Sequence, residues 1–379
     1  MFERVFQHRM MLADQVRMEA YKKAINEVIR KGDIVVDIGT GSGVLAFFAV
    51  QAGARKGYAI EQDRIITEAE KLAELNRLEK RIVFIRGRSD RVELPEKVDV
   101  VISEIIGHFG LDEHVLRFKD DARERFLKPG GKFIPSWLEL YLVPVESEVI
   151  WRNNIGLWSN DFYSLDLSPV RNYAISQRYV QDCSGRVKQL AAPFLVSHID
   201  FYKIEKTQSV FEGEFLINKK GNFHGFVGFH QTGLSQKIVI STSPENLLTN
   251  WGHSFFPLHD VVPVENGDRV TFRIKAIPQD DALFWEWDTG VKRNGVKKAK
   301  FSQSNFTITK EELVIGRSDF RPILSKEAEM MRRVLGLCNG NTTMGEIAEI
   351  LMAEYPGEYK NLKDATRTVA GIVRGKVNI

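Results

Sequence analysis

The chain has 379 residues, of which 43% are hydrophobic and 27% charged, a composition typical of globular proteins and long enough for two or three domains. The net charge of +3 gives no global argument for binding nucleic acid or a membrane surface. The two cysteines, Cys183 and Cys338, form no metal-ligand pattern, so we expect neither a disulfide framework nor a metal. We see no secretory signal and no membrane-spanning run, so we expect a cytoplasmic protein.

The first part of the chain alternates between helical and strand-like patterns. Apolar residues recur at helical spacing over residues 10–30, and a further helical pattern covers residues 65–75. Short β-rich runs stand at residues 34–36, 56–60, 82–85 and 99–102. This alternation predicts right-handed βαβ units and a parallel sheet, in an α/β, Rossmann-like domain over residues 1–136.

The pattern changes near Ser136. Val270, Phe272, Ile274 and Ala276 alternate with polar residues, which predicts a half-buried strand. Many such strands predict an antiparallel β-barrel over residues 137–310. We interpret its basic stretch, residues 292–300, as a solvated turn rather than a binding patch.

The last part is helical again. Helical patterns cover residues 327–337, 344–354 and 363–373, and Thr343 and Glu346 fit a capping box. We predict a small winged-helix domain over residues 311–379.

A glycine-rich turn follows the first predicted strand, at Gly39, Gly41 and Gly43. Glycines let the backbone turn sharply and let a ligand approach it. A dinucleotide site would favour G-x-G-x-x-G, whereas this G-x-G-x-G follows an acid, Asp37, and suits a ligand with an ammonium group and no phosphate.

Acidic residues also follow the next two strands. Glu61 could accept both hydroxyls of a ribose, and Asp90 is placed to accept from an adenine amino group. Three acids at three strand ends favour a cofactor site over a purely structural turn.

Several segments together resemble the protein arginine methyltransferases. Residues 8–17 resemble the family's N-terminal helix signature, and residues 103–113 resemble its double-glutamate loop, with Glu104 and Glu113 at the family spacing. Asn250 and Trp251 resemble the substrate loop borne by the barrel, and parts of residues 151–190 resemble the dimerisation arm. The likeness runs from about residue 8 to residue 290.

The resemblance implies S-adenosylmethionine as cofactor, an arginine-containing peptide or protein as substrate, and a homodimer. It places Arg17 at the cofactor's carboxylate, and Asp37, Gly39 and Gly41 at the methionine part. Glu61 would hold the ribose and Asp90 would lie near the adenine, with His8 as a further cofactor residue. Glu104 and Glu113 would be catalytic. The substrate-binding residues would be Asp14, His108, Asn250 and Trp251.

The sequence departs from the family pattern at four places. Ile105-Ile106 stands where the family usually has Trp-Met after the first glutamate. His108 stands where the family has tyrosine, and Asn250 stands where it has histidine. The aromatic N-terminal helix that covers the family's cofactor is nearly absent, with Phe2 and Phe6 as the only candidates.

The chemistry agrees with the assignment of the two glutamates. An arginine side chain is protonated at physiological pH and is a poor nucleophile. Two carboxylates can clamp its planar fork and leave one nitrogen facing a methyl donor. Methylation of free arginine, or of another small guanidine or amine, remains an alternative. A catalytically silent scaffold is a further one, which the retained Glu61, Glu104 and Glu113 disfavour.

The C-terminal segment resembles the PqqD-like winged-helix domains, which bind leader peptides. The resemblance implies that the acceptor could be a ribosomally made precursor peptide. A module that only stabilises the dimer is an equal alternative. Glu346, Glu349 and Glu354 in the second helix argue against contact with nucleic acid.

Overall fold

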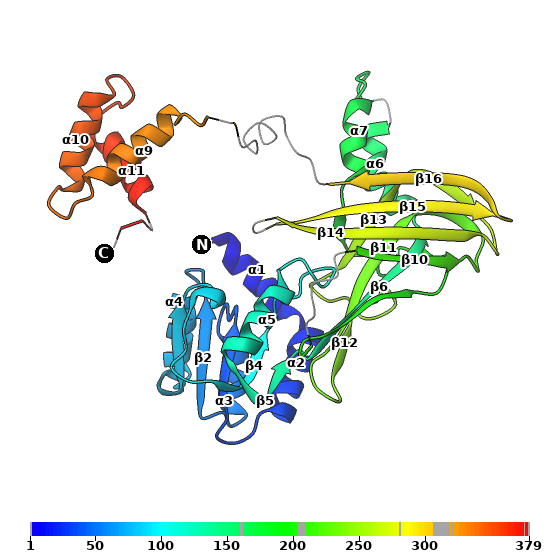
Figure 1. Ribbon diagram of the computed structural model, residues 1–379, viewed down its shortest axis with the longest axis horizontal. Coiled ribbons are helices and arrows are strands. Elements are labelled where there is room, and N and C mark those ends of the chain that lie inside the picture. Colours follow the sequence, from blue (N-terminus) through cyan, green and yellow to red (C-terminus); the bar gives the residue numbers. More distant parts are fainter. Residues whose placement is uncertain are drawn as a thin grey trace. The chain divides into compact units, whose positions relative to one another are not determined.

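A five-stranded parallel sheet organises the N-terminal half of the protein (Figure 1). The computed structural model describes residues 2–159, 162–203, 210–279, 282–305, 319, 321–374 and 376–377. They divide into two compact units, Met1–Phe306 and Thr307–Ile379. The sheet belongs to the first unit, and its strands follow the order β3-β2-β1-β4-β5. The strands are β1 (Ile34–Ile38), β2 (Lys56–Glu61), β3 (Ile82–Arg86), β4 (Val98–Ser103) and β5 (Leu127–Ile134).

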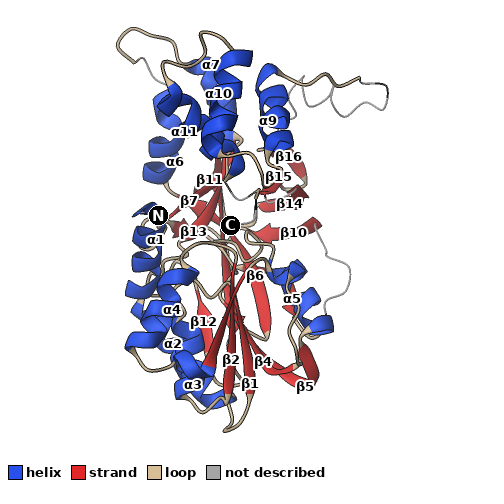
Figure 2. Cartoon of the chain, turned by 90° about the vertical axis from the view of Figure 1, so that its left-hand side faces the viewer, coloured by secondary structure: helices blue, strands red, loops and turns tan. Residues whose placement is uncertain are grey.

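All five strands are parallel, so their carboxyl ends meet at one edge of the sheet. Figure 2 shows α2, α3 and α4 on one face of this sheet and α5 on the other, as expected for βαβ units. The helices are α1 (Phe2–Ala13), α2 (Gln15–Val28), α3 (Val44–Gln51), α4 (Ile66–Leu75) and α5 (Val115–Arg125), with short 3₁₀ turns η1 (Glu79–Arg81) and η2 (Ser89–Arg91). The predicted Rossmann-like class is confirmed.

Two expectations for the N-terminus are wrong. The single helix predicted over residues 10–30 is two helices, because Asp14 leaves the helical conformation and its side chain accepts the N–H of Arg17 as an N-cap. The N-terminal helix that we expected to be nearly absent is also present. It is α1, and its low aromatic content concealed it.

The second half of this unit is antiparallel. One sheet has the order β10-β14-β15-β16, and the other has the order β7-β13-β11-β6-β8, with β12 on β11 and β9 on β6. The strands of the first sheet are β10 (Val210–Leu216), β14 (Arg269–Gln279), β15 (Ala282–Arg293) and β16 (Val296–Ser304). Those of the second are β6 (Trp137–Glu146), β7 (Tyr179–Gln181), β8 (Lys188–Gln189), β9 (Phe194–Asp200), β11 (Gly221–Gly233), β12 (Val239–Ser241) and β13 (His253–Val264).

Aromatic side chains fill the space between these sheets. Phe226 of one sheet packs against Phe215 and Phe272 of the other, and Phe256 packs against Trp285 and Trp287. The alternation predicted in β14 is confirmed, because its apolar members Val270, Phe272, Ile274 and Ala276 are buried.

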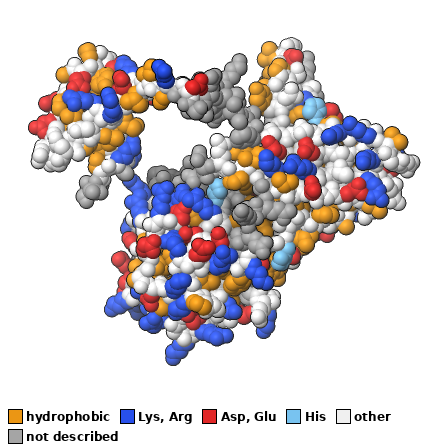
Figure 3. Space-filling view, viewed as in Figure 1, with side chains coloured by type: hydrophobic (Ala, Val, Ile, Leu, Met, Phe, Trp, Pro, Cys, Tyr) orange, Lys and Arg blue, Asp and Glu red, His pale blue; other side chains and the backbone are white. Residues whose placement is uncertain are grey.

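The basic stretch contains a turn, as predicted, but most of its residues belong to strands. It covers the end of β15 and the start of β16, which a two-residue turn, Asn294-Gly295, joins with positive φ at both positions. An Asn-Gly pair favours this hairpin geometry. On the face in Figure 3, basic and acidic side chains are interspersed.

Helices α6 (Glu148–Ile155) and α7 (Ser168–Ile175), with the short turn η3 (Gly156–Ser159), form the segment predicted to be an arm. Figures 1 and 2 both place α6 and α7 on the side of the antiparallel sheets that faces away from the parallel sheet.

The described residues of the second unit form three helices: α9 (Lys326–Leu337), α10 (Met344–Glu354) and α11 (Leu362–Val373). They share a small core that includes Val334, Leu351 and Val369. Thr343 and Glu346 form the predicted capping box. Within the described residues of this unit there is no strand, so the winged-helix assignment is not confirmed. Every helix that the structure describes is too short or too polar to cross a bilayer.

Candidate active site

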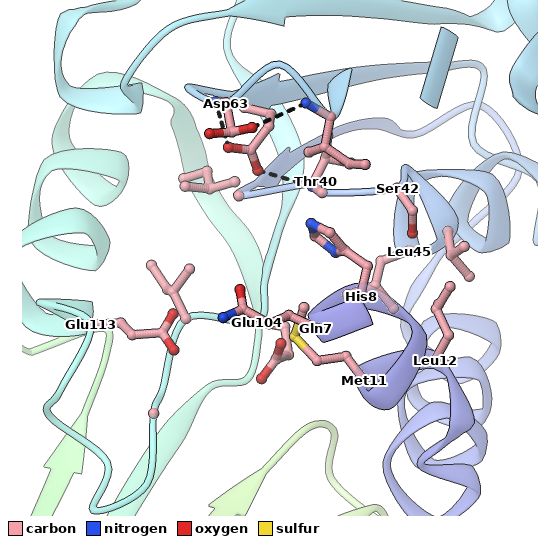
Figure 4. A pocket seen from close by; sticks show the side chains of 18 of the residues that line it. Gln7, His8, Met11, Leu12, Thr40, Ser42, Leu45, Asp63, Glu104 and Glu113 are labelled. Carbon is pink, nitrogen blue, oxygen red and sulfur yellow. Dashed lines mark hydrogen bonds between the residues drawn. The ribbon is translucent and has the colours of Figure 1, made fainter. Parts of the chain in front are cut away.

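A cavity of about 660 Å³ opens at the carboxyl edge of the parallel sheet. Its walls come from α1, α2, the glycine turn after β1, the end of β2 and the loop after β4. The barrel adds the loop between β12 and β13, through Asn250 and Trp251. Figure 4 shows Glu104 and Glu113 in one part of the cavity and Thr40 and Asp63 in another, with His8 of α1 between them.

The glycine turn has a conformation that side chains would disturb. Gly39, Gly41 and Gly43 all have positive φ, at 70°, 55° and 85°. A Cβ on Gly41 would lie 2.7 Å from Cε1 of His8. The turn therefore needs glycine at this position, both for its backbone and for the close approach of α1.

Glu61 closes the turn from the neighbouring strand. Its Oε2 accepts the N–H of Gly41 at 3.1 Å, and its Oε1 accepts the N–H of Asp63 at 2.8 Å. These bonds fix the carboxylate at the cavity wall, where oxygen lone pairs remain available to a ligand with hydroxyl groups.

Two of the predicted cofactor residues do not line the cavity. Asp37 is buried beneath the turn and accepts the hydroxyl of Thr40 at 2.6 Å, while burial raises the pKa of its carboxyl to about 7. Asp90 binds Arg88 through both carboxylate oxygens and Arg117 through one, at 2.6–3.0 Å. Arg88 lines the cavity in its place.

Glu104 is held at both oxygens by neighbouring side chains. Nη1 of Arg17 lies 3.0 Å from Oε2, and the indole N–H of Trp251 donates to Oε1 at 2.9 Å. Burial raises the pKa of Glu104, and Arg17 and Trp251 oppose that rise. Arg17, predicted to meet the cofactor's carboxylate, lines the same cavity but is paired here with Glu104.

Glu113 has a weaker set of compensating partners. Burial, and then the charges of Glu104 and Asp112, raise its pKa to about 8, while Arg17 lowers it. The two glutamates are therefore electrostatically unequal, because Glu104 has an adjacent guanidinium and Glu113 does not.

The remaining predicted substrate residues lie where the two halves of the unit meet. Asp14 accepts the N–H of Asn250 at 2.7 Å and does not line the cavity. His108 binds the backbone oxygen of Trp251 through Nδ1. These contacts tie the N-terminal helices and the loop after β4 to the barrel.

The sequence reasoning missed some lining residues, notably Met11, Met18, Tyr21 and Arg88. The hydroxyl of Tyr21 donates to the carbonyl of Ser103, directly before Glu104, at 3.1 Å. Tyr21 could have been predicted as a lining residue, because it stands four positions after Arg17 and residues four apart lie on the same face of a helix.

Comparisons with known proteins agree with this arrangement. A family model for the arginine methyltransferase oligomerization subdomain matches residues 138–287, and one for ribosomal protein L11 methyltransferase matches residues 21–138. The chain is 32% identical over 291 residues to protein arginine N-methyltransferase 6 of Danio rerio, covering 72% of this chain and 82% of that protein. The chain belongs to the protein arginine N-methyltransferase family.

Further relatives support this membership. Protein arginine N-methyltransferase 1 of Dictyostelium discoideum is 30% identical over 281 residues, covering 72% of this chain and 82% of that protein. The solved structure of protein arginine methyltransferase 10 of Arabidopsis thaliana has 26% identity and a TM-score of 0.69, covering 79% and 98% of the two chains. A Trypanosoma brucei PRMT1 enzyme–prozyme complex with AdoHcy has the same fold, with 23% identity, a TM-score of 0.72, and coverage of 78% and 96%.

The protein is therefore an S-adenosylmethionine-dependent arginine N-methyltransferase. Its own residues fit this cofactor: Gly41 has a positive φ and brings the backbone close to His8 of α1, and the fixed carboxylate of Glu61 suits ribose hydroxyls. Both matched family models end by residue 287, so the PqqD-like resemblance of the C-terminal unit stays a prediction.

Proposed function

We propose that this enzyme methylates arginine side chains of protein substrates, with Glu104 and Glu113 as the ligands of the guanidinium. The observation that carries the proposal is that both carboxyl groups line the cavity that also contains the glycine turn and Glu61. A guanidinium bound there would face the cofactor. The relatives reported above are named for protein arginine methylation, and none of them supports a ribosomal precursor peptide as acceptor.

The two glutamates would have different roles in the reaction. When bound, S-adenosylmethionine supplies a methyl group carried on a positive sulfonium. Glu104, held by Arg17 and Trp251, is a fixed negative acceptor for the guanidinium fork. Glu113, once the bound guanidinium has favoured its ionised form, is suited to receive the proton that the methylated nitrogen must lose.

Binding of the acceptor would itself change the charge of Glu113. The pKa of about 8 describes a carboxyl without a cation beside it. A guanidinium within hydrogen-bond distance favours the ionised form, so it would drive Glu113 toward the carboxylate that completes the clamp. The positive charge of the acceptor therefore helps to select a guanidinium over a neutral group.

A transfer assay with labelled methyl groups tests this function. The acceptors would be an arginine peptide, the same peptide with lysine for arginine, and free arginine, with products identified by mass spectrometry. We expect transfer to the arginine peptide alone. Transfer mainly to free arginine, or to lysine, would refute the proposal.

We also propose that the enzyme is a homodimer formed through α6, η3 and α7. Large side chains in this segment are exposed in the single chain, including Tyr163 at 86%, Tyr173 at 65% and Leu165 at 58%. Exposed aromatic residues commonly anchor interfaces, and the matched oligomerization subdomain spans this segment. Light scattering at micromolar concentration should give twice the chain mass of 43.3 kDa, and Y163S/Y173S should lower it.

A further inference from the structure

The double-glutamate loop, residues 104–113, is anchored to the barrel by Asp112, the residue directly before Glu113. One oxygen of Asp112 accepts the N–H of Phe109 within the loop at 2.8 Å. The other lies 2.8 Å from Nη2 of Arg178, and the two side chains are only 11% and 13% exposed. Asp112 therefore joins the fold of the loop to a residue outside it.

Arg178 is itself held rigidly. It follows α7 and precedes β7, the strand that pairs with β13. Its Nη1 donates to the hydroxyl of Ser254 in β13 at 2.7 Å, and its guanidinium lies 5.6 Å from the ring centroid of Trp285. The ring of Phe109 packs on the same Trp285 at 5.3 Å. One buried tryptophan thus supports both the loop and the arginine that pairs with it.

We propose that Arg178 is a positioning residue for methyl transfer, acting through Asp112 to hold Glu113 in place and to neutralise the charge beside it. The inference rests on the proposed role of Glu113 as a guanidinium ligand. Arg178 does not line the cavity, so its effect on the reaction has to pass through Asp112. Because it directly follows the segment proposed to form the dimer, it also connects that segment to the catalytic loop.

The charges around Glu113 give this role a measurable consequence. Glu104, at the end of β4, and Asp112 raise its pKa, and Arg17 of α2 lowers it. The hydroxyl of Tyr21, also on α2, donates to the carbonyl of Ser103, and burial followed by the charge of Glu104 raises the pKa of Tyr21. Without Arg178, Asp112 would be a partly buried carboxylate with no counter-ion, so it would disfavour ionisation of Glu113 more strongly.

The test compares R178Q, D112N and the double variant D112N/R178Q on an arginine peptide across pH. We expect R178Q to lower kcat on the order of ten- to a hundredfold, as for a displaced catalytic group. The acid limb of its pH profile should move to higher pH by on the order of one unit, and that of D112N should move to lower pH. The double variant should be little worse than the worse single variant, since the two residues act as one unit.

A matched control is R293Q. Arg293 binds the buried Asp268 through two nitrogens at 2.8 Å in the barrel, so its loss perturbs a similar ion pair away from the loop. R293Q should keep the wild-type acid limb. Cofactor affinity, measured by calorimetry, should be unchanged in all these variants, which separates loop positioning from damage to the cofactor site.

Two outcomes would overturn the inference. One is that R178Q and D112N both lower kcat while the acid limbs of their pH profiles stay at the wild-type position. That result would show that Arg178 and Asp112 only pack the loop. The other is that R178Q keeps normal kcat. If R178Q does not fold, the R178K variant replaces it, because lysine keeps the positive charge but lacks the planar fork. A lower kcat with the acid limb of the pH profile at its wild-type position would then support the proposal. An unchanged kcat would overturn it. A wild-type enzyme that is inactive on arginine peptides would instead refute the proposed function.

Discussion

The indole N–H of Trp251 donates to Oε1 of Glu104 at 2.9 Å, joining residues that lie 147 positions apart in the chain. The barrel thereby supplies one of the two partners of a carboxylate that belongs to the parallel sheet. Arg17 supplies the other, and its guanidinium also lies 5.5 Å from the Trp251 ring centroid. The position of Glu104 therefore depends on α2 and on the barrel together.

We expect W251F to lower turnover by roughly tenfold, because a buried carboxylate loses a hydrogen bond while the packing of the ring is largely kept. The matched control is W287F, which removes an indole N–H that donates to the carbonyl of Pro257 inside the barrel. Steady-state kinetics on an arginine peptide would check both. Equal losses in the two variants would contradict a specific role for Trp251.

Glu61 gives a prediction for the cofactor. E61A should weaken binding of S-adenosylmethionine by tenfold or more, because it removes the predicted ribose acceptor and the bond that fixes the N–H of Gly41. E96A is a suitable control. Glu96 binds the hydroxyl of Tyr58, a residue of β2 like Glu61, and Glu96 does not line the cavity. Calorimetry that showed normal affinity in E61A would count against the cofactor site as drawn.

The sequence predicted β1 to β4 because they are short runs rich in β-branched and aromatic residues, and their carboxyl ends had to meet at one edge. For the same reason it placed Glu61 and Glu104 at the cavity that they line, whereas Asp90, which it also placed there, does not line the cavity. The sequence reasoning missed β5, whose sequence contains Pro129-Gly130-Gly131.

The contact between Asp14 and Asn250 was beyond such reasoning, since it joins residues 236 positions apart and depends on how the barrel docks. The orientation of Asp90 was also beyond it, because Arg117 lies 27 positions later on another element.

The break between α1 and α2 was predictable in principle. Aspartate is a preferred N-cap residue, and Asp14 caps α2 through the N–H of Arg17. The apolar periodicity continued across this position and favoured one long helix. Local capping, rather than periodicity, decided the structure there.

The raised pKa of Glu113 predicts a stability effect with a definite sign. Burial raises this pKa from 4.5 to about 8, so between these pH values the folded state holds a proton that the unfolded state releases. Stability from this group is present below about pH 4.5 and is lost as pH rises toward about 8. The E113Q variant removes that dependence, so it should melt several degrees above wild type at pH 9 and close to wild type at pH 4.5.

Thermal unfolding across this pH range would check the effect. E93Q is the control, because Glu93 is 87% exposed and should leave the wild-type dependence in place. A wild-type protein that melts no lower than E113Q at pH 9 would show that Glu113 is ionised at no cost in the free enzyme.

The final prediction is that Glu104 and Glu113 act together on one guanidinium. E104Q and E113Q should each lower turnover by on the order of a hundredfold, because an amide keeps the shape of the carboxylate but removes its charge from a buried cation. The double variant should be little worse than either single variant, as for residues that work as a unit. Cofactor binding should survive in all three, and E124Q, at a residue of α5 that is 70% exposed, should keep normal turnover. The distinguishing measurement is single-turnover transfer to an arginine peptide at saturating cofactor, because it isolates the chemical step from product release. If the losses of the two single variants multiplied in the double variant, the glutamates would be acting on separate steps, and the clamp would have to be abandoned.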